Sequence, residues 1–114
     1  MDNSSNELVE ELAFSWLEMH KKSALSFLVL STLKNEELWS LEIRNSIIES
    51  TGWTISDRAF YKLLKRMNSQ GVIEHKLIAG KNTGSDRKVY KLTHLGIQLL
   101  KLQKESIDYL SKIL

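Results

Sequence analysis

The sequence contains no cysteine and no proline. Without cysteine, the chain can form no disulfide framework, thiolate zinc finger or cysteine nucleophile, and this composition suits a reducing cytosol. No apolar run reaches the length of about 18 residues that a membrane span requires, so we expect no membrane partner. The first six residues are polar and lack a basic region, so we expect no secretory signal. These absences favour a cytoplasmic protein.

The residues that usually carry catalysis are also sparse or badly spaced. The three histidines, His20, His75 and His94, have no second histidine or carboxylate at ligand spacing. The order of serine, histidine and aspartate indicates no triad, and no pair of acids lies in an apolar context. We therefore expect no metal, no cofactor and no enzymatic activity.

What the chain does contain is typical of one small globular domain. Its 114 residues, 42% apolar and 26% charged, are enough to bury a core without covalent staples. The net charge of +2 hides a strong asymmetry. Residues 54–91 carry nine basic and three acidic side chains, a net +6, whereas the remainder carries seven basic and eleven acidic ones, a net −4. A basic module in an acidic frame indicates a surface that binds a polyanion.

Apolar residues at helical spacing predict five helices. A polar break at 21–23 separates the first two. The second is apolar almost all round, which also suits a strand, but its leucine content and lack of alternation favour a buried helix. Ser56 and Gly71 are typical start and stop residues for the fourth. The expected ranges are about 5–20, 24–33, 40–51, 56–69 and 94–112.

Two short β-branched segments, 72–78 and 87–92, flank a stretch rich in glycine, asparagine and serine, and this pattern predicts a hairpin. Two helices joined by the tight turn 52–55 and followed by a hairpin are typical of a winged helix-turn-helix. We therefore predict a mainly α (α+β) fold in a single domain, 1–114. It has an extra N-terminal helix at 5–20, a winged core at 24–92 and a C-terminal dimerisation helix at 94–112.

The helix 56–69 has two different faces. Phe60, Leu63, Leu64 and Met67 cluster on one side of a helical wheel, and basic residues occupy the other. Arginine, lysine, tyrosine and serine contact phosphates and base edges in protein–DNA complexes. A solvated charged face, with a mobile hairpin beside it, is the alternative. The candidate DNA-binding residues are Ser56, Arg58, Tyr61, Lys62, Lys65 and Arg66 on this helix and Lys81, Arg87 and Lys88 on the hairpin.

The last helix carries apolar residues at alternating spacings of four and three, which suits pairing between helices. The same stripe could instead pack on its own domain. Because the helix lies outside the expected core, and the apolar face of 5–20 also needs cover, pairing with a second copy is favoured. The candidate dimerisation residues are Leu8, Leu12 and Trp16 in the first helix and Leu95, Leu99, Leu102, Tyr109 and Ile113 in the last.

Two functions fit this pattern. The first is a transcriptional regulator that binds double-stranded DNA sequence-specifically as a homodimer. The alternative is a winged-helix module of a replication or segregation complex that binds protein or non-specific DNA. Trp16, Trp39 and Trp53 could stack on a small aromatic effector at the dimer interface, although such residues more often anchor cores or interfaces.

Four stretches, 25–33, 60–67, 71–74 and 88–96, carry a resemblance to a known family, and the last holds an aromatic residue, a basic residue, Leu-Thr and Gly from strand into helix. With these stretches the chain resembles the PadR-like winged-helix transcriptional regulators from about Ala24 to Leu110. The resemblance implies dimers clasped by the terminal helices. The chain departs from the family in lacking a proline near the start of helix 56–69 and in carrying 38–43 where a His-Gly-Tyr-like stretch is usual.

Overall fold

The computed structural model describes residues 3–80 and 86–114, so the predicted hairpin residue Lys81 lies outside the described residues. These ranges form four helices and a small antiparallel sheet, which confirms the predicted mainly helical winged fold. The elements are α1 Asn3–Thr32, β1 Leu38–Trp39, α2 Ser40–Thr51, α3 Asp57–Ser69, β2 Ile73–Ile78, β3 Arg87–Leu92 and α4 His94–Ile113.

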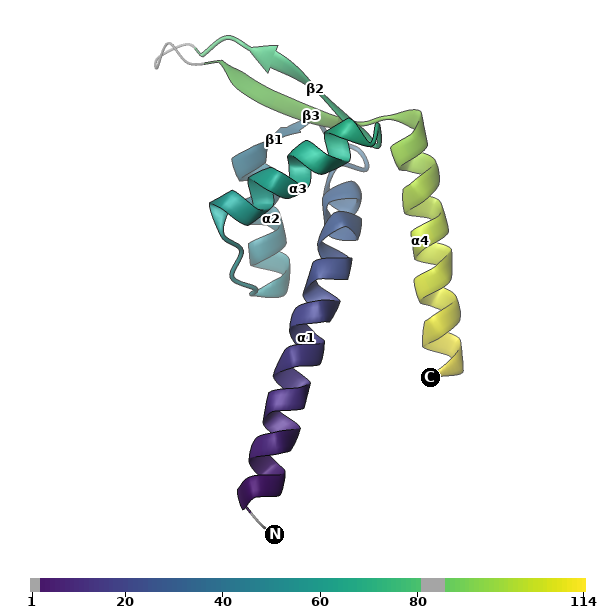
Figure 1. The fold of residues 1–114 in the computed structure, drawn as a ribbon. Helices are drawn as coiled ribbons and strands as arrows, with labels where there is room; N and C mark the ends of the chain where they lie inside the picture. The colour runs from purple at the N-terminus through teal and green to yellow at the C-terminus, as the bar shows by residue number, and fades with distance from the viewer. Residues whose placement is uncertain (1–2, 81–85) are drawn as a thin grey trace.

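The first helix corrects one prediction. The expected break at 21–23 was wrong, because α1 runs without interruption from Asn3 to Thr32 (Figure 1). Polar residues do not end a helix when their side chains find partners within it. Lys21 Nζ lies 3.3 Å from Glu18 Oε1, and the Ser23 hydroxyl donates to the His20 carbonyl at 2.9 Å. One helix therefore carries both the N-terminal extension and the first segment of the core.

The sheet has the strand order β1-β3-β2, with both pairs antiparallel. The hairpin β2–β3 agrees with the sequence prediction to within a residue at each end. The strand β1 was not predicted: Leu38 pairs with Tyr90, and Trp39 pairs with Val89. Trp39 is also the N-cap of α2, and its backbone N–H donates to Glu42 Oε1 at 3.1 Å.

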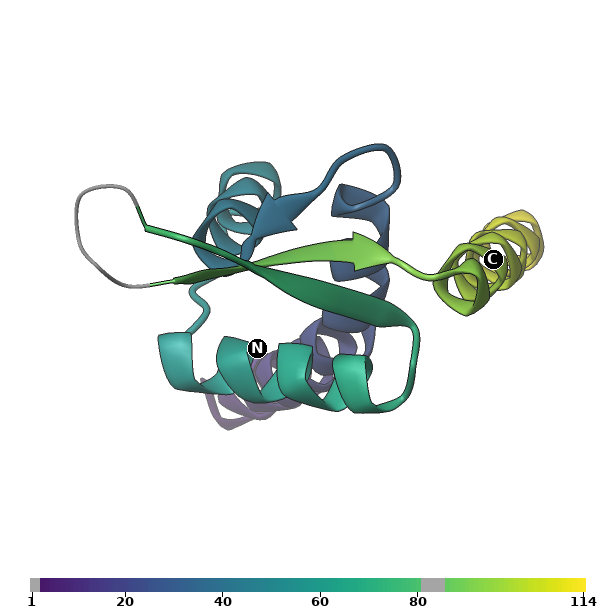
Figure 2. The same cartoon turned by 90° about the horizontal axis from the view of Figure 1, so that it is seen from above.

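The core lies where α2, α3 and the last turns of α1 meet the sheet. Figure 2 shows α3 lying along the sheet. The two long helices leave this core in the same direction, so both chain ends lie far from the sheet (Figure 1). The buried apolar residues are Val29, Leu30, Leu33, Ile43, Ile47, Ile55, Phe60, Leu63, Leu64, Met67, Val72, Ile73 and Tyr90.

A compact set of contacts fixes the start of α4. The Thr93 hydroxyl donates to the Gly71 carbonyl at 2.6 Å and accepts from the Gly96 N–H at 3.0 Å. A Cβ atom at Gly96 would lie 2.0 Å from the Val72 carbonyl oxygen, which is closer than any real contact. The Leu-Thr and Gly pattern at the strand-to-helix junction therefore has a steric cause, because only glycine lets α4 approach the turn before β2.

Candidate nucleic-acid interface

The helix α3 divides as its sequence predicts. Phe60, Leu63, Leu64 and Met67 are all buried against the core. The opposite face is exposed, and its cations reach solvent from every turn of the helix. These exposed residues are Ser56 at the cap, followed by Arg58, Tyr61, Lys62, Lys65 and Arg66.

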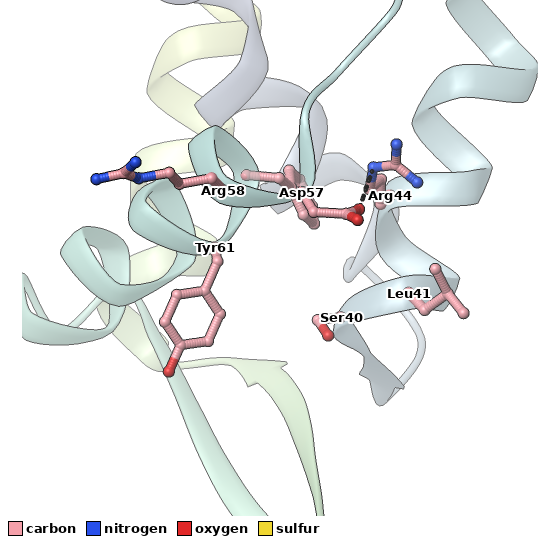
Figure 3. Close-up of a pocket in the computed structure, with 7 residues that line it drawn as sticks. Ser40, Leu41, Arg44, Asp57, Arg58 and Tyr61 are labelled. Atoms are coloured by element: carbon pink, nitrogen blue, oxygen red, sulfur yellow. Dashed lines mark ion pairs between the residues drawn. The ribbon is translucent and has the colours of Figure 1, made fainter.

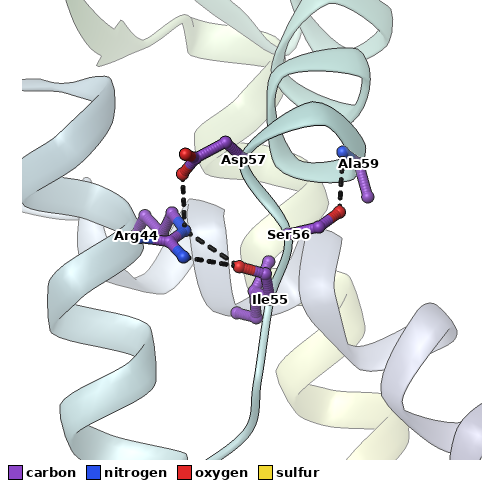
Figure 4. A network of polar contacts seen from close by, with 5 residues as sticks. All are labelled: Arg44, Ile55, Ser56, Asp57 and Ala59. Atoms are coloured by element: carbon purple, nitrogen blue, oxygen red, sulfur yellow. Dashed lines mark hydrogen bonds and ion pairs between the residues drawn. The ribbon is translucent and has the colours of Figure 1, made fainter.

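Two sets of polar contacts hold the N-terminus of α3 in place (Figure 4). The Ser56 hydroxyl accepts from the Ala59 N–H at 3.1 Å, so this residue is a helix cap. The Arg44 guanidinium reaches across from α2 and donates twice to the Ile55 carbonyl, at 2.7 and 3.0 Å. Its Nε also lies 3.2 Å from Asp57 Oδ1. Arg44 thus ties the turn before α3 to α2 and fixes the angle between the two helices.

An open cavity of about 570 Å³ lies between the N-terminal ends of α2 and α3 (Figure 3). Ser40 and Leu41 line it from α2, and Arg58 and Tyr61 line it from α3. In Figure 3 the Tyr61 ring points from α3 toward the strands, while Arg58 extends away from the other labelled residues. Of the two arginines that line this cavity, Arg44 is held by Asp57 and the Ile55 carbonyl, whereas the exposed Arg58 is outside the described ion pairs.

The basic residues of the sheet fall into two groups. Lys76 pairs with Glu37 at 3.2 Å, and Lys91 pairs with Glu74 at 3.3 Å. Arg87 and Lys88, both exposed, instead lie over aromatic rings. The Arg87 Cζ is 4.3 Å from the centre of the Trp39 ring, and the Lys88 Nζ is 5.7 Å from that of Tyr61.

Tyr90 closes the core beneath this surface. Burial, and to a smaller extent the neighbouring Tyr61, raises the pKa of Tyr90 above its ordinary value of 10.0. The Tyr90 hydroxyl is therefore neutral at physiological pH, and the side chain packs in the core as an uncharged group. Within residues 3–80 and 86–114 no cluster of three histidine or acidic side chains is placed to hold a metal ion.

Sequence reasoning missed Arg44 and Trp39 as parts of this surface. Arg44 gave no signal, because one arginine on a helix is ordinary and its partner is a backbone carbonyl eleven residues later. For Trp39 the sequence indicates a core or interface anchor, or a residue that stacks on a ligand. Its position beside Arg87 depends on the pairing of β1 with β3, which local sequence does not reveal.

The terminal helices expose most of their predicted dimerisation residues. Leu8, Leu12 and Trp16 on α1 are exposed, as is nearly every residue before Lys21. On α4, Leu99 differs from the rest, because it is half-buried and packs against this chain's own core. The other predicted residues of α4, Leu95, Leu102, Tyr109 and Ile113, are exposed.

A tight helix–turn–helix, a second helix with an exposed cationic face, and a following antiparallel hairpin together define a winged helix-turn-helix protein. The sequence matches the model of the transcriptional regulator PadR-like family over residues 29–102. The match covers well over half of the chain, and the protein belongs to this family.

Solved structures agree with this assignment. A PadR-like transcriptional regulator from Bacillus cereus is 27% identical, with a TM-score of 0.74 over 83% of this chain and 91% of that one. A PadR family regulator from Eggerthella lenta is 24% identical, with a TM-score of 0.78 over 93% and 91% of the two chains. No curated protein matches the sequence. In the described part of the chain, no helix is long and apolar enough to cross a membrane.

Proposed function

We propose that this member of the PadR-like family is a homodimeric regulator that binds double-stranded DNA sequence-specifically through α3, with the hairpin contacting phosphates. One observation supports this most strongly. The described ion pairs use Lys21, Arg44, Lys76 and Lys91. Among the described residues, none of the cations exposed on α3 has a carboxylate within ion-pair distance, so their charge is available to a polyanion.

The second α-helix of a helix-turn-helix enters the major groove, where arginine and lysine read guanine edges and also bind phosphates. Arg58 and Lys62 lie on the exposed face of the first turns of α3, the part that contacts bases in this class. The anchoring by Ser56 and Arg44 presents these side chains from a rigid element. Family membership favours a regulator over the alternative of a winged-helix assembly module.

The dimer is supported by exposed apolar surface. The first turns of α1 carry Leu8, Leu12 and Trp16 in solvent, and α4 carries Leu102 and Tyr109. Monomeric proteins seldom leave large apolar patches uncovered, and these two helices expose many large apolar side chains. Charge is complementary as well: the described residues of α1 before Lys21 include four glutamates and no lysine or arginine, whereas α4 has three lysines and two acids.

A two-fold dimer would present two copies of α3 to successive major grooves, about 34 Å apart, and would favour near-palindromic sites. The proposed small aromatic effector would use Trp16 at this interface. Arg87 lies over the Trp39 ring, and Trp53 packs on the core. Trp16, which is 71% exposed on α1, therefore has the ring most accessible for stacking on a ligand.

The test begins with selection of bound sequences from random DNA duplexes. Arg58→Ala and Lys62→Ala are each expected to weaken binding to the selected duplex by about 1–3 kcal/mol where the side chain reads a base. Where it contacts a phosphate, the slope of log K against log salt should instead fall by about one. Affinity is measured by fluorescence anisotropy over a range of salt concentrations.

The matched control is the pair Lys22→Ala and Lys34→Ala, which removes the same charge from exposed positions outside α3 and the hairpin. It should leave sequence preference unchanged. Failure of the selection to enrich any sequence would contradict sequence-specific binding. Unaltered affinity in the folded Arg58→Ala, Lys62→Ala double variant would contradict the assignment to α3.

A further inference from the structure

The four described cations of β2 and β3 are held in two different ways. Lys76 and Lys91 each meet a carboxylate, at 3.2 and 3.3 Å. Arg87 and Lys88 each lie over an aromatic ring and, within the described residues, form no ion pair. A carboxylate neutralises the cation that it holds. A ring holds a cation by its quadrupole and leaves the positive charge in place.

The sheet register explains why Arg87 meets Trp39. Trp39 on β1 lies directly opposite Val89 on β3, so the two side chains share one face of the sheet. Arg87 stands two residues before Val89 and therefore points to the same face. A diagonal neighbour of this kind is within reach of a large aromatic ring, and the Cζ-to-ring-centre distance is 4.3 Å.

Lys88 points to the other face of β3, which it shares with the buried Tyr90. The Lys88 side chain is exposed and lies over the exposed Tyr61 ring of α3 rather than in the interior. The two cations thus leave β3 on opposite faces, and each is supported by a ring from a different element. The Trp39 ring comes from β1, and the Tyr61 ring comes from α3.

We propose that Trp39 is a positioning residue for DNA binding: its indole ring holds the Arg87 guanidinium ordered and fully charged, ready to contact a phosphate of the duplex. Tyr61 supports Lys88 in the same way at longer distance. This inference rests on the proposed function. An exposed arginine loses conformational freedom when it binds, and ordering it beforehand reduces that cost. The planar guanidinium stacks on a ring through its face and keeps its N–H groups free at the edge, where they match a phosphate.

The test is a double-mutant cycle on a mixed-sequence DNA duplex of about 30 base pairs, about three helical turns. Arg87→Gln should weaken binding and lower the salt slope by about one. Trp39→Leu, with Arg87 intact, should weaken binding about two- to fivefold, the range expected of an exposed cation–π contact. In the Arg87→Gln background, Trp39→Leu should have no further effect.

The matched control is Lys91→Gln, which removes a cation of the same strand that Glu74 already neutralises, and its effect on affinity should be smaller than that of Arg87→Gln. If Trp39→Leu weakens binding equally with and without Arg87, Trp39 has only a structural role and the proposal fails. If the wild-type protein binds no duplex, the proposed function fails as well, which is a different result from binding without coupling.

Because Trp39 also pairs with Val89 in the sheet, a second measurement avoids dependence on the folding of Trp39→Leu. In the free wild-type protein, stacking on the indole ring should shift the NMR signals of the Arg87 Hδ protons upfield. Trp39→Phe, which keeps an aromatic ring, should retain part of this shift and most of the duplex affinity. Random-coil shifts for Arg87 in the folded wild-type protein would overturn the proposal.

Discussion

The two ends of α1 use the same kind of residue in opposite ways. Near its C-terminus, Val29 and Leu30 are 0% exposed and form part of the core. Near its N-terminus, Trp16 is 71% exposed and Phe14 is 67% exposed, although both halves are rich in large apolar residues. The winged core therefore buries its apolar residues within one chain, whereas the terminal helices present theirs outward. A hydrophobic pattern identifies a face that needs cover, but it does not say which molecule covers it.

Charge differs between the same two regions. In the described part of the chain, α3 and β3 carry exposed cations that form no ion pair, and the contacts of Arg44 anchor α3. The terminal helices carry charges of both signs beside their apolar stripes, which suits a protein partner better than a polyanion. Changes in the core should therefore alter the stability of each protomer, and changes in the terminal helices should alter assembly.

The largest effect on protomer stability is expected from Gly96→Ala. The new Cβ would meet the Val72 carbonyl oxygen at 2.0 Å, and backbone on both sides would have to move. We expect a loss of about 3 kcal/mol or more in the free energy of unfolding, as for severe overpacking. The measurement is urea denaturation followed by circular dichroism.

Gly52→Ala is the matched control, because the same methyl group is added where nothing lies within 4 Å. Its cost comes from the positive φ of 73° alone and should be about 1–2 kcal/mol. Equal losses for the two variants would show that the approach of α4 to Val72 does not constrain the junction.

A smaller effect is expected from Arg44→Met. The guanidinium donates to the Ile55 carbonyl from a half-buried position, and its removal leaves that carbonyl without its charged donor. We expect a loss of about 2 kcal/mol, the range for hydrogen bonds to charged groups. Affinity for DNA should also fall, because the turn that orients α3 is loosened.

Asp57→Asn separates the two contacts of Arg44. The Asp57 side chain is 88% exposed, so this ion pair is screened by solvent and contributes little. The variant should lose less than about 1 kcal/mol, which includes the interaction of the acid with the N-terminus of α3. A loss as large as that of Arg44→Met would mean that the ion pair, not the carbonyl contact, holds the turn.

Much of this fold could be predicted from the sequence, because its signals are local. Ser56 as a cap, and the buried stripe Phe60 to Met67, follow from residue type and spacing within a single helix. The failures have non-local causes. The polar residues Lys21 to Ser23 predict a break, but Lys21 and Ser23 have partners within α1 that the sequence does not show. The strand β1 forms because it pairs with β3, about fifty residues later in the chain.

The candidate surface divides in the same way. Exposure of Arg58 and Lys62 follows from helical geometry, whereas the roles of Arg44 and Trp39 depend on contacts between separate elements. Leu99 belongs to the apolar repeat of α4, which predicts contact with a partner helix. In the structure it packs on the core of its own chain. Periodicity alone cannot distinguish a residue that faces its own core from one that faces a partner.

The smallest effect on the protomer, and the largest on assembly, is expected from Leu102→Glu combined with Tyr109→Glu. Both side chains are more than half exposed, so the single chain gains no buried charge, and core stability should change by less than about 0.5 kcal/mol. In a dimer that pairs these helices, the carboxylates would be desolvated beside each other, which strongly disfavours association. Sedimentation equilibrium should show wild-type mass near twice 13.2 kDa and variant mass near 13.2 kDa.

The matched control introduces two glutamates at uncharged positions where α4 is exposed but outside the apolar repeat, as in Gln98→Glu with Ser111→Glu. Thermal unfolding adds a second criterion, since only an assembling protein should gain stability as its concentration rises. In the Leu102→Glu, Tyr109→Glu variant this concentration dependence should disappear, and duplex affinity should fall to that of a single half-site. That result would show that the terminal helices control assembly and that the core controls the stability of each protomer. A wild-type chain that stays at 13.2 kDa at tens of micromolar, yet binds one half-site tightly, would mean that the apolar faces of α1 and α4 serve another partner.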